Sequence, residues 1–334
     1  MKEAVLYRRE DDTVVCTACS RYCRLSDGQT GFCGVRKNVG GHLNLLNYGI
    51  AYAVQIDPIE KKPILHMKPG ASILSIGTTG CNFSCRYCQN YDMSQRKEIL
   101  GDRIDPERIV KLALAYGCDG IAFTYNEPTI FMEYAHDVGV LARKHGLINI
   151  FVTNGYETTE SIEYASDFLD AATVDFKGNG SPEFYRRYIA IGSVEPIYDT
   201  IKALIDHSVH VEITDLVVPH IGDSLEEAEK MISRILRIGG NEIPVSFLRF
   251  HPDYLLRDIE ATPTPLLEEH LSLARNMGVS YAYIGNVPGH QAQSTYCPKC
   301  GAMLIKRDTF SSEIVSLDHQ GRCKKCGYHT GIIL

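Results

Sequence analysis

Apolar and polar positions follow a regular pattern from about residue 72 to residue 285. Short β-branched or aromatic runs are separated by longer stretches with apolar residues at helical spacing, which is typical of a parallel sheet covered by helices. The predicted strands are "SILSIG", "GIAFTY", "INIFVT", "AATVDF", "VHVEITDLVV", "PVSFLRF" and "SYAYIG". About six β/α units in sequence predict a partial or complete α/β barrel, with an open doubly wound sheet as the alternative.

The stretches between these strands predict helices with recognisable ends. In "DPERIVKLALAYG", Asp105 stands at an N-cap position, Pro106 at the first helical position, and Gly117 closes the helix. Further helices are predicted in "PTIFMEYAHDVGVLARKHG", "EPIYDTIKALIDH", "SLEEAEKMISRILRIGG" and "TPLLEEHLSLARNMG". In barrels the chemistry sits on loops that leave the carboxyl ends of the strands. Those loops read "TTGCNFSC", "YNEP", "TNG", "DFKG", "PHIGD" and "HPD", so polar residues at six consecutive strand ends predict one shared site.

Chain length and cysteine content suggest three units. A chain of 334 residues exceeds the ~250 to 300 residues at which single cores stop growing, which favours a main domain with appendages. We expect a cysteine-rich module at residues 1–70, a barrel core at 71–293 and a zinc-ribbon-like module at 294–334. The fold expected is therefore an α/β barrel with small cysteine-rich metal-binding modules at both ends.

Hydropathy and charge exclude some partners. No apolar run approaches the ~18 residues of a membrane span, and "MKEAVLYRREDD" lacks the apolar region of a signal peptide. We therefore expect a cytoplasmic protein without a membrane partner. The net charge is −7, and the acidic excess lies in the central segment, between two basic ends. An acidic main domain argues against nonspecific nucleic-acid binding.

Cysteines are the most informative residues in the composition. In a reducing compartment, twelve cysteines at short spacings indicate metal sites and not disulfides. Eleven of them form three clusters, and Cys118 stands alone in "YGCDGIAF", where a small buried hydrophobe is the better interpretation.

The central cluster holds three cysteines, Cys81, Cys85 and Cys88, in "TTGCNFSCRYCQNYDM". Its spacing is C-x₃-C-x₂-C, and the residues that follow supply no fourth thiolate. Three thiolates on a four-iron cluster would leave one iron with an open position for a small ligand. The alternative is a three-thiolate zinc site completed by a histidine.

The same loop carries an aromatic residue, Tyr87, just before the third cysteine. With the strand pattern that follows, the loop resembles that of the radical S-adenosylmethionine (SAM) superfamily. The resemblance implies a partial (β/α)6-type barrel and a [4Fe-4S] cluster whose open iron binds the amino and carboxylate groups of SAM. One electron from the cluster would then cleave SAM to methionine and a 5′-deoxyadenosyl radical, which abstracts hydrogen from a substrate.

The resemblance also implies roles for residues at the strand ends. The segment that holds the SAM amino group matches "YNEP", although its glycines are replaced, and the ribose-contacting region matches the "TNG" loop. "VDFKG" and "ITDLVVPHIGDS" resemble segments of the pyruvate formate-lyase activating enzymes, which place a basic residue near Thr214. The cosubstrate-binding residues implied are Tyr87, Asn126, Glu127, Thr153, Asn154, Asp175, Thr214 and His251. The catalytic residues implied are the three cysteines together with Lys177 and His251.

A closer resemblance spans nearly the whole chain. "CTACSRYCRLSDGQTGFCGVRKN", "AFTYNEPTIF" and "YIGNVPGHQAQSTYCPKCG" are similar to the radical SAM member of the AmmeMemoRadiSam system. That family is related to the activating enzymes and is associated with AMMECR1-like and Memo-like proteins. The resemblance therefore implies these two partners, together with an electron donor such as flavodoxin or ferredoxin.

The two flanking cysteine groups predict further metal sites. "CPKCG" and "CKKCGY" are typical of a zinc ribbon, with iron in a rubredoxin-like site as the alternative; the ligands are Cys297, Cys300, Cys323 and Cys326. For the N-terminal group we favour zinc, because a small module needs a metal to stabilise it, and an auxiliary [4Fe-4S] cluster is the rival. That group comprises Cys16, Cys19, Cys23 and Cys33.

These observations favour a radical SAM enzyme that abstracts hydrogen from its substrate. One outcome is modification of a small molecule, lipid or protein, which the extra metal modules favour. The other is activation of a glycyl radical enzyme, which the "DFK" segment favours. A protein of another class, a zinc-dependent RNA- or protein-binding adaptor on an inactive barrel, is the remaining alternative.

Overall fold

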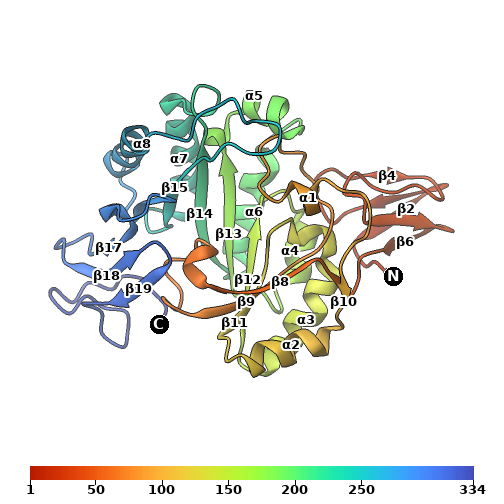
Figure 1. Ribbon diagram of the computed structural model, residues 1–334, viewed down its shortest axis with the longest axis horizontal. Helices are drawn as coiled ribbons and strands as arrows, with labels where there is room; N and C mark the ends of the chain where they lie inside the picture. Colours follow the sequence, from red (N-terminus) through yellow and green to blue (C-terminus); the bar gives the residue numbers. More distant parts are fainter.

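A computed structural model describes residues 1–334, and its centre is one eight-stranded sheet (Figure 1). The strands are β8 (Ala53–Pro58), β9 (Ser72–Gly77), β11 (Gly120–Phe123), β12 (Ile148–Thr153), β13 (Ala171–Lys177), β14 (His210–Val217), β15 (Val245–Arg249) and β16 (Ala282–Gly285). Seven strands, β9 to β16, run parallel in the order of the chain, and β8 pairs antiparallel with β9. Strands β8 and β16 each have one neighbour, so the sheet is open.

Helices connect the parallel strands. They are α1 (Tyr91–Ser94), α2 (Pro106–Ala115), α3 (Met132–Lys144), α4 (Thr159–Ala165), α5 (Pro182–Phe184), α6 (Glu195–Asp206), α7 (Leu225–Gly239) and α8 (Thr264–Asn276). Short helical turns are η1 (Ile59–Lys61), η2 (Pro128–Phe131), η3 (Gly178–Gly180), η4 (Tyr185–Ile189) and η5 (Gln291–Gln293). None of the helices combines the length and the apolar character that crossing a bilayer requires.

The structure confirms the strands and helices that the sequence pattern predicts. All seven predicted strands form the parallel sheet, and the five predicted helices are present. The strand order never reverses, which excludes the doubly wound alternative. Asp105 has the extended backbone of an N-cap, yet its side chain makes no capping hydrogen bond. Strand β8 and helix α4 are additional elements; β8 is an edge strand with half-exposed positions, so its pattern is weak.

The N-terminal segment folds as small antiparallel sheets beside the main sheet, on the side opposite the C-terminal ribbon (Figure 1). Its strands are β1 (Lys2–Glu3), β2 (Tyr7–Glu10), β3 (Thr13–Cys16), β4 (Arg24–Leu25), β5 (Arg36–Val39), β6 (His42–Leu45) and β7 (Ile50–Ala51), the last paired with β10 (Asp102–Arg103). A buried ion pair between Arg36 and Glu133, with an N···O distance of 2.6 Å, joins this segment to helix α3. Arg36 also donates to the Ile130 carbonyl oxygen.

The C-terminal ribbon contains β17 (Thr295–Tyr296), β18 (Met303–Asp308) and β19 (Ser311–Ile314). It is bonded to the main domain by backbone and side chains. The Ile333 N–H donates to the His66 carbonyl oxygen, and the Tyr281 hydroxyl donates to the Thr330 carbonyl oxygen. The Arg307 side chain, which is 1% exposed, donates to the Leu65 carbonyl oxygen at 2.5 Å. The ribbon is therefore packed onto the main domain and not tethered by a linker.

Arg307 supplies the first prediction. Its guanidinium also bonds the Thr295 hydroxyl and lies 3.9 Å from the buried carboxylate of Glu60. Arg307→Met would leave Glu60 buried without its cation, so we expect the free energy of unfolding to fall by about 3 kcal/mol. Urea denaturation of the two proteins measures the difference. Lys306→Met, on the exposed side of the same strand, is the matched control and should change stability little. Equal losses of unfolding free energy in both variants would show that the contact between Arg307 and Glu60 does not stabilise the fold.

Candidate functional site

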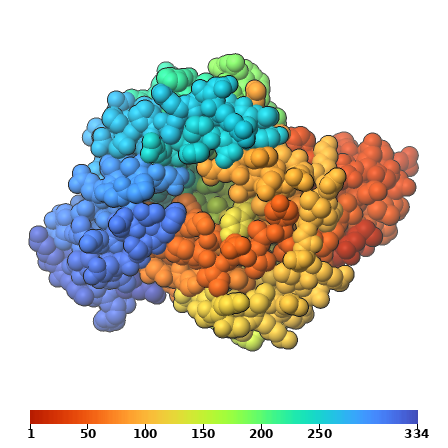
Figure 2. All heavy atoms as spheres, in the orientation of Figure 1, coloured from red at the N-terminus to blue at the C-terminus, as the bar shows by residue number.

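The main cavity has a volume of about 560 Å³ and lies at the carboxyl ends of the parallel strands. Residues of β12, β13, β14, β15 and β16 all line it. Figure 2 shows the hollow at the centre of the molecule, where green and yellow atoms of the sheet are visible between orange, cyan and blue segments. Three further segments contribute residues to its lining. They are the stretch between β8 and β9, called the N-terminal extension below, the loop after β15, and the C-terminal ribbon.

Eleven of the twelve residues predicted around the central site line this one cavity. They are Cys81, Cys85, Tyr87, Cys88, Asn126, Thr153, Asn154, Asp175, Lys177, Thr214 and His251. They come from loops and strands up to 170 positions apart in the sequence, and the parallel topology brings their strand ends to one edge. Glu127 is the exception, because its side chain is buried behind the lining.

The three cysteines sit in the loop between β9 and α1. Backbone bonds attach this loop to the segment after α5: the Ser84 N–H donates to the Ile189 carbonyl oxygen and the Arg86 N–H to the Tyr188 carbonyl oxygen. The Phe83 N–H donates to the Cys81 sulfur at 3.4 Å. These bonds hold the thiols at the cavity wall without a regular helix or strand.

The central cysteines are not gathered as the ligands of a single metal ion would be. Four sulfurs around one zinc ion, with Zn–S bonds near 2.3 Å, lie about 3.8 Å apart. The central group does not form a set of three ligand atoms that all lie within 4.8 Å of one another, with or without a histidine or carboxylate. In an iron–sulfur cluster each cysteine binds a different iron, so wider spacing is expected. Three thiol side chains on the wall of a cavity of about 560 Å³ fit a [4Fe-4S] cluster held by three thiolates.

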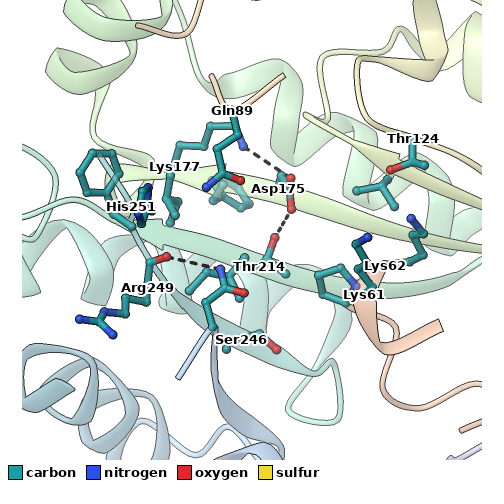
Figure 3. Close-up of a pocket in the computed structure, with 18 of the residues that line it drawn as sticks. Lys61, Lys62, Gln89, Thr124, Asp175, Lys177, Thr214, Ser246, Arg249 and His251 are labelled. Carbon is teal, nitrogen blue, oxygen red and sulfur yellow. Dashed lines mark hydrogen bonds and ion pairs between the residues drawn. The ribbon is translucent and has the colours of Figure 1, made fainter. Parts of the chain in front are cut away.

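A polar group lies next to the cysteines in the cavity (Figure 3). Lys177 Nζ lies 3.5 Å from Asp175 Oδ2, and the Thr214 hydroxyl donates to Asp175 Oδ1. The negative charge of Asp175 and of nearby thiolates raises the pKa of Lys177 against the effect of burial, so the ammonium stays charged. His251 and Gln89 lie on the Lys177 side of Asp175 in this view.

Tyr87 forms part of the apolar wall. Its ring packs on Phe184 and Phe250, with centroid distances of 5.8 and 6.1 Å. It is 5% exposed, and burial, together with the neighbouring Cys85 sulfur, raises the pKa of its hydroxyl well above the ordinary value. The ring therefore closes the apolar wall beside the second cysteine of the loop.

Glu127 joins two strand ends behind the cavity. Its carboxylate accepts from the backbone N–H of Thr129 at 3.1 Å and of Asn154 at 2.8 Å. Asn154 Nδ2 in turn donates to Asn82 Oδ1 at 2.7 Å, beside the first cysteine of the loop. The "YNEP" glutamate thus positions the "TNG" loop and the cysteine loop from outside the cavity.

The Thr153 hydroxyl lies between two buried carboxyl groups, those of Glu127 and Glu157. Thr153 Oγ1 lies 2.9 Å from Glu127 Oε1 and 2.5 Å from Glu157 Oε1. The hydroxyl has one hydrogen and can donate to only one carboxylate. The other carboxyl group must therefore carry a proton and donate it to the hydroxyl oxygen. Burial, with the neighbouring Glu157 charge, raises the pKa of Glu127 to about 8, and burial also raises the pKa of Glu157. The pair therefore holds a proton near neutral pH.

Sequence reasoning missed the part of the lining that comes from the two ends of the chain. The N-terminal extension supplies Lys61 and Lys62, whose ammonium groups each lie 2.7 Å from the carboxylate of Asp57. The ribbon supplies Arg307, and Thr309 and Phe310 follow it at the hairpin turn. These residues lie in no strand-end loop of the parallel sheet, so no periodicity or motif marks them.

The C-terminal cysteines form a compact four-sulfur site. The Cys297 and Cys326 sulfurs lie 3.6 Å apart, and those of Cys300 and Cys323 lie 3.8 Å apart. All four sulfurs lie within 4.8 Å of one another, as expected around one tetrahedral ion. The N-terminal group is not gathered so tightly and instead lines a small cavity of its own, with Arg21, Arg36 and Asn82.

One sequence-family model, two curated proteins and one solved structure are similar to this chain. A sequence model of the radical SAM superfamily matches residues 75–235. The protein MJ0808 of Methanocaldococcus jannaschii, which its own name describes as uncharacterized, is 41% identical over 338 residues and covers 100% of both chains. The pyruvate formate-lyase-activating enzyme of Clostridium pasteurianum is 29% identical over 206 residues, which is 54% of this chain and 81% of that enzyme. The solved structure of Streptococcus suis SuiB bound to S-adenosylmethionine has a TM-score of 0.49 at 12% identity, covering 68% of this chain and 53% of that one.

The three-cysteine loop, the cavity at the strand ends and the matched domain define a radical SAM enzyme. The chain belongs to the same family as MJ0808, with which it aligns over its full length.

The carboxyl pair supplies the second prediction. Because the pKa of Glu127 is raised from 4.5 to about 8, the folded protein holds a proton that the unfolded chain releases, so the free energy of unfolding falls as pH rises through this window. Glu157→Gln removes the competing charge, so we expect stability at pH 8 to rise by about 1 kcal/mol or more, with a flatter slope between pH 5 and 8.

Urea denaturation at the two pH values measures this effect. Glu163→Gln, an exposed position on α4, is the matched control and should keep the wild-type slope. Unchanged or lower stability of Glu157→Gln at pH 8 would show that the two carboxyls do not compete.

Proposed function

We propose that this enzyme cleaves SAM reductively and uses the resulting radical to take hydrogen from a substrate bound in the main cavity. The observation that carries the proposal is the gathering of three cysteines and eight other predicted site residues around one cavity. When bound, a [4Fe-4S] cluster on Cys81, Cys85 and Cys88 would supply the electron that converts SAM to methionine and a 5′-deoxyadenosyl radical. Seven parallel strands in chain order, five of which contribute residues to one cavity, support a partial (β/α)6-type barrel as the scaffold.

The residues of the chain would bind and orient SAM. The Lys177 ammonium, kept charged by Asp175, is suited to the SAM carboxylate. The Asn154 side chain after β12 is suited to a ribose hydroxyl, and the Thr153 hydroxyl, already shared between Glu127 and Glu157, would hold that loop in place. His251, from the loop after β15, would face the adenosyl group. Glu127 would act on SAM only by positioning Thr153 and Asn154. Thr214 would act by holding the Asp175 carboxylate.

The remaining cavity wall would receive the substrate. It carries Lys61 and Lys62 from the N-terminal extension, Ser246 from β15, and Arg307 and Phe310 from the C-terminal end. Because this wall is built from segments outside the superfamily match at residues 75–235, we place substrate choice in the extensions. Modification of a small molecule, a lipid or a protein side chain that enters the cavity is the preferred outcome.

Activation of a glycyl radical enzyme is the second candidate. The match to a pyruvate formate-lyase-activating enzyme over 54% of this chain favours it. The two outcomes differ in where the radical is stored. A stable glycyl radical signal in electron paramagnetic resonance (EPR) spectra of a partner enzyme would support activation. If none of the glycyl radical enzymes encoded in the source genome shows this signal, direct modification of a substrate is the outcome that remains.

Partners and the ribbon metal are further parts of the proposal. Reduced flavodoxin or ferredoxin would supply the electron, as expected from the related activating enzymes. The resemblance to the AmmeMemoRadiSam system suggests AMMECR1-like and Memo-like partners. Zinc is proposed for the four C-terminal cysteines, because their sulfur spacing fits one tetrahedral ion.

The third prediction tests the central cysteines. Replacing all three by Ala should abolish formation of 5′-deoxyadenosine from SAM under dithionite, because no cluster could then bind SAM. Chromatographic detection of 5′-deoxyadenosine after anaerobic reconstitution measures this. Cys118→Ala, at the buried lone cysteine, is the matched control and should retain activity. SAM cleavage by the triple variant would refute the proposed function.

The fourth prediction tests the SAM carboxylate contact. Lys177→Met should weaken SAM binding by roughly ten- to a hundredfold, because a charge-assisted hydrogen bond of ~1.5 to 3 kcal/mol is lost. Equilibrium binding to the reconstituted protein measures the affinity, and iron content checks that the cluster is retained. Lys61→Met alters a cavity lysine that Figure 3 shows apart from Lys177, beyond Asp175, and should leave SAM affinity unchanged. Equal affinities in both variants would mean that SAM binds elsewhere in the cavity.

A further inference from the structure

The solvent-facing side of the cysteine loop carries a positive charge that the cavity does not use. Cys85 and Cys88 line the main cavity, whereas Arg86, which stands between them in the sequence, is exposed and does not line it. The two thiols and the intervening guanidinium therefore lie on different sides of the loop. Only the loop itself separates the thiols from the solvent at Arg86.

A neighbouring segment adds two more arginines at this place. The Arg86 N–H donates to the Tyr188 carbonyl oxygen in η4. Arg186 and Arg187 directly precede Tyr188, and both of their side chains are exposed. The backbone bond therefore brings three exposed arginines close together on two segments that lie about 100 positions apart in the sequence.

Arg21 connects the N-terminal module to the same two segments. Its side chain donates to the Asn82 carbonyl oxygen in the cysteine loop and to the Ala190 carbonyl oxygen just after η4. Its guanidinium carbon lies 3.6 Å from the centroid of the Phe32 ring, and the side chains of Phe32 and Tyr22 are exposed. Arginine beside aromatic rings is typical of surfaces that bind other proteins.

The four residues Arg21, Arg86, Arg186 and Arg187, called the arginine patch below, have few acidic neighbours. Arg187 forms an ion pair with Glu183 at 3.2 Å, and the other three side chains form no ion pair. The stretches 13–26, 81–91 and 184–194, which carry the patch, contain no Asp or Glu. The patch is therefore a cationic surface on a protein whose net charge is −7.

The proposed chemistry needs a partner at this side of the loop. Reductive cleavage consumes one electron for each SAM, and a cluster on the three cysteines has to receive that electron from outside the protein. SAM and the substrate would occupy the cavity side of the loop, so an electron donor approaches from the solvent side. Opposite charges on donor and enzyme would raise the rate of encounter and orient the two proteins.

We propose that the arginine patch docks an acidic one-electron donor protein of the flavodoxin or ferredoxin type. In this step the donor loses one electron and the cluster gains it, and no covalent bond forms or breaks. The inference rests on the proposed function, because a donor is needed only if the central cysteines hold a redox-active cluster. A nucleic acid, whose phosphates are also attracted to arginine, is the alternative occupant.

Formation of 5′-deoxyadenosine with two reductants tests the proposal. With a limiting amount of a reduced flavodoxin of negative net charge, at low salt, the double variant Arg86→Gln, Arg186→Gln should form it about tenfold more slowly than the wild type. With dithionite, which needs no docking surface, the two rates should be equal. Added KCl should slow the flavodoxin-dependent rate of the wild type more than that of the variant.

Two further variants guard this result against a disturbed cysteine loop. Arg186→Glu lies outside the loop and should also slow only the flavodoxin-dependent rate. The double variant Lys111→Gln, Lys144→Gln is the matched control, because it removes two exposed positive charges from α2 and α3, which Figure 1 shows far from α5. It should keep both wild-type rates. Equal slowing of the control and the patch variants with flavodoxin would overturn the docking site.

The dithionite measurement separates this inference from the proposed function. If the wild type does not cleave SAM with dithionite, the proposed function is refuted. If it does, and if both patch variants keep the wild-type rate with flavodoxin, only the docking site is refuted. A gel-shift assay with an RNA oligonucleotide tests the other occupant. RNA binding that the double patch variant loses, with its flavodoxin-dependent rate unchanged, would assign the patch to nucleic acid and overturn the proposal.

Discussion

The carboxylate of Glu127 holds together the strand ends on which the active cavity depends. It is 1% exposed and is bonded to the start of η2, to the Thr153 hydroxyl and to the Asn154 N–H. Parallel strands are bonded along their length, but the loops that leave their ends need other partners for their polar backbone groups. A buried acid can satisfy several N–H donors at once, and here it fixes the spacing of two loops. Asn154 then passes that constraint to Asn82 and the cysteine loop.

This arrangement has an electrostatic cost. The cysteine loop gathers thiols that must ionise to bind metal, and Glu127 and Glu157 lie buried behind them. Burial raises the pKa values of both acids, and the Glu157 charge raises that of Glu127 further, so the site can keep one of them neutral while it accommodates thiolates. Lys177 supplies positive charge on the opposite, cavity-facing side. Charge around the cluster loop is thus balanced by protonation behind it and by a cation in front of it.

The sequence pattern predicts the central sheet because each strand is marked by residues that are close together in the chain. Each parallel strand is a short apolar run that ends in polar loop residues, and parallel topology places those ends together whatever the helices do between them. Eleven predicted residues therefore converge on one cavity. Glu127 shows the limit of this reasoning, since a motif gives the position of a residue but not the direction of its side chain. Lys62 and Arg307 reach the cavity through tertiary packing of distant segments, which no local pattern encodes.

The segment between β8 and β9 and the C-terminal ribbon meet at the cavity, although the N-terminal sheets lie on the opposite side of the main sheet from the ribbon (Figure 1). Lys62 approaches from the extension that precedes β9, and Arg307 approaches from the ribbon and bonds the Leu65 carbonyl oxygen of that same extension. The ribbon hairpin is short, and a small hydrophobic cluster with the four-cysteine site holds it in shape. Metal binding there would fix the strand that carries Arg307, because small modules gain much of their folding free energy from the metal. The ribbon metal would then act on the enzyme at a distance, by setting the position of the wall against which a substrate must fit.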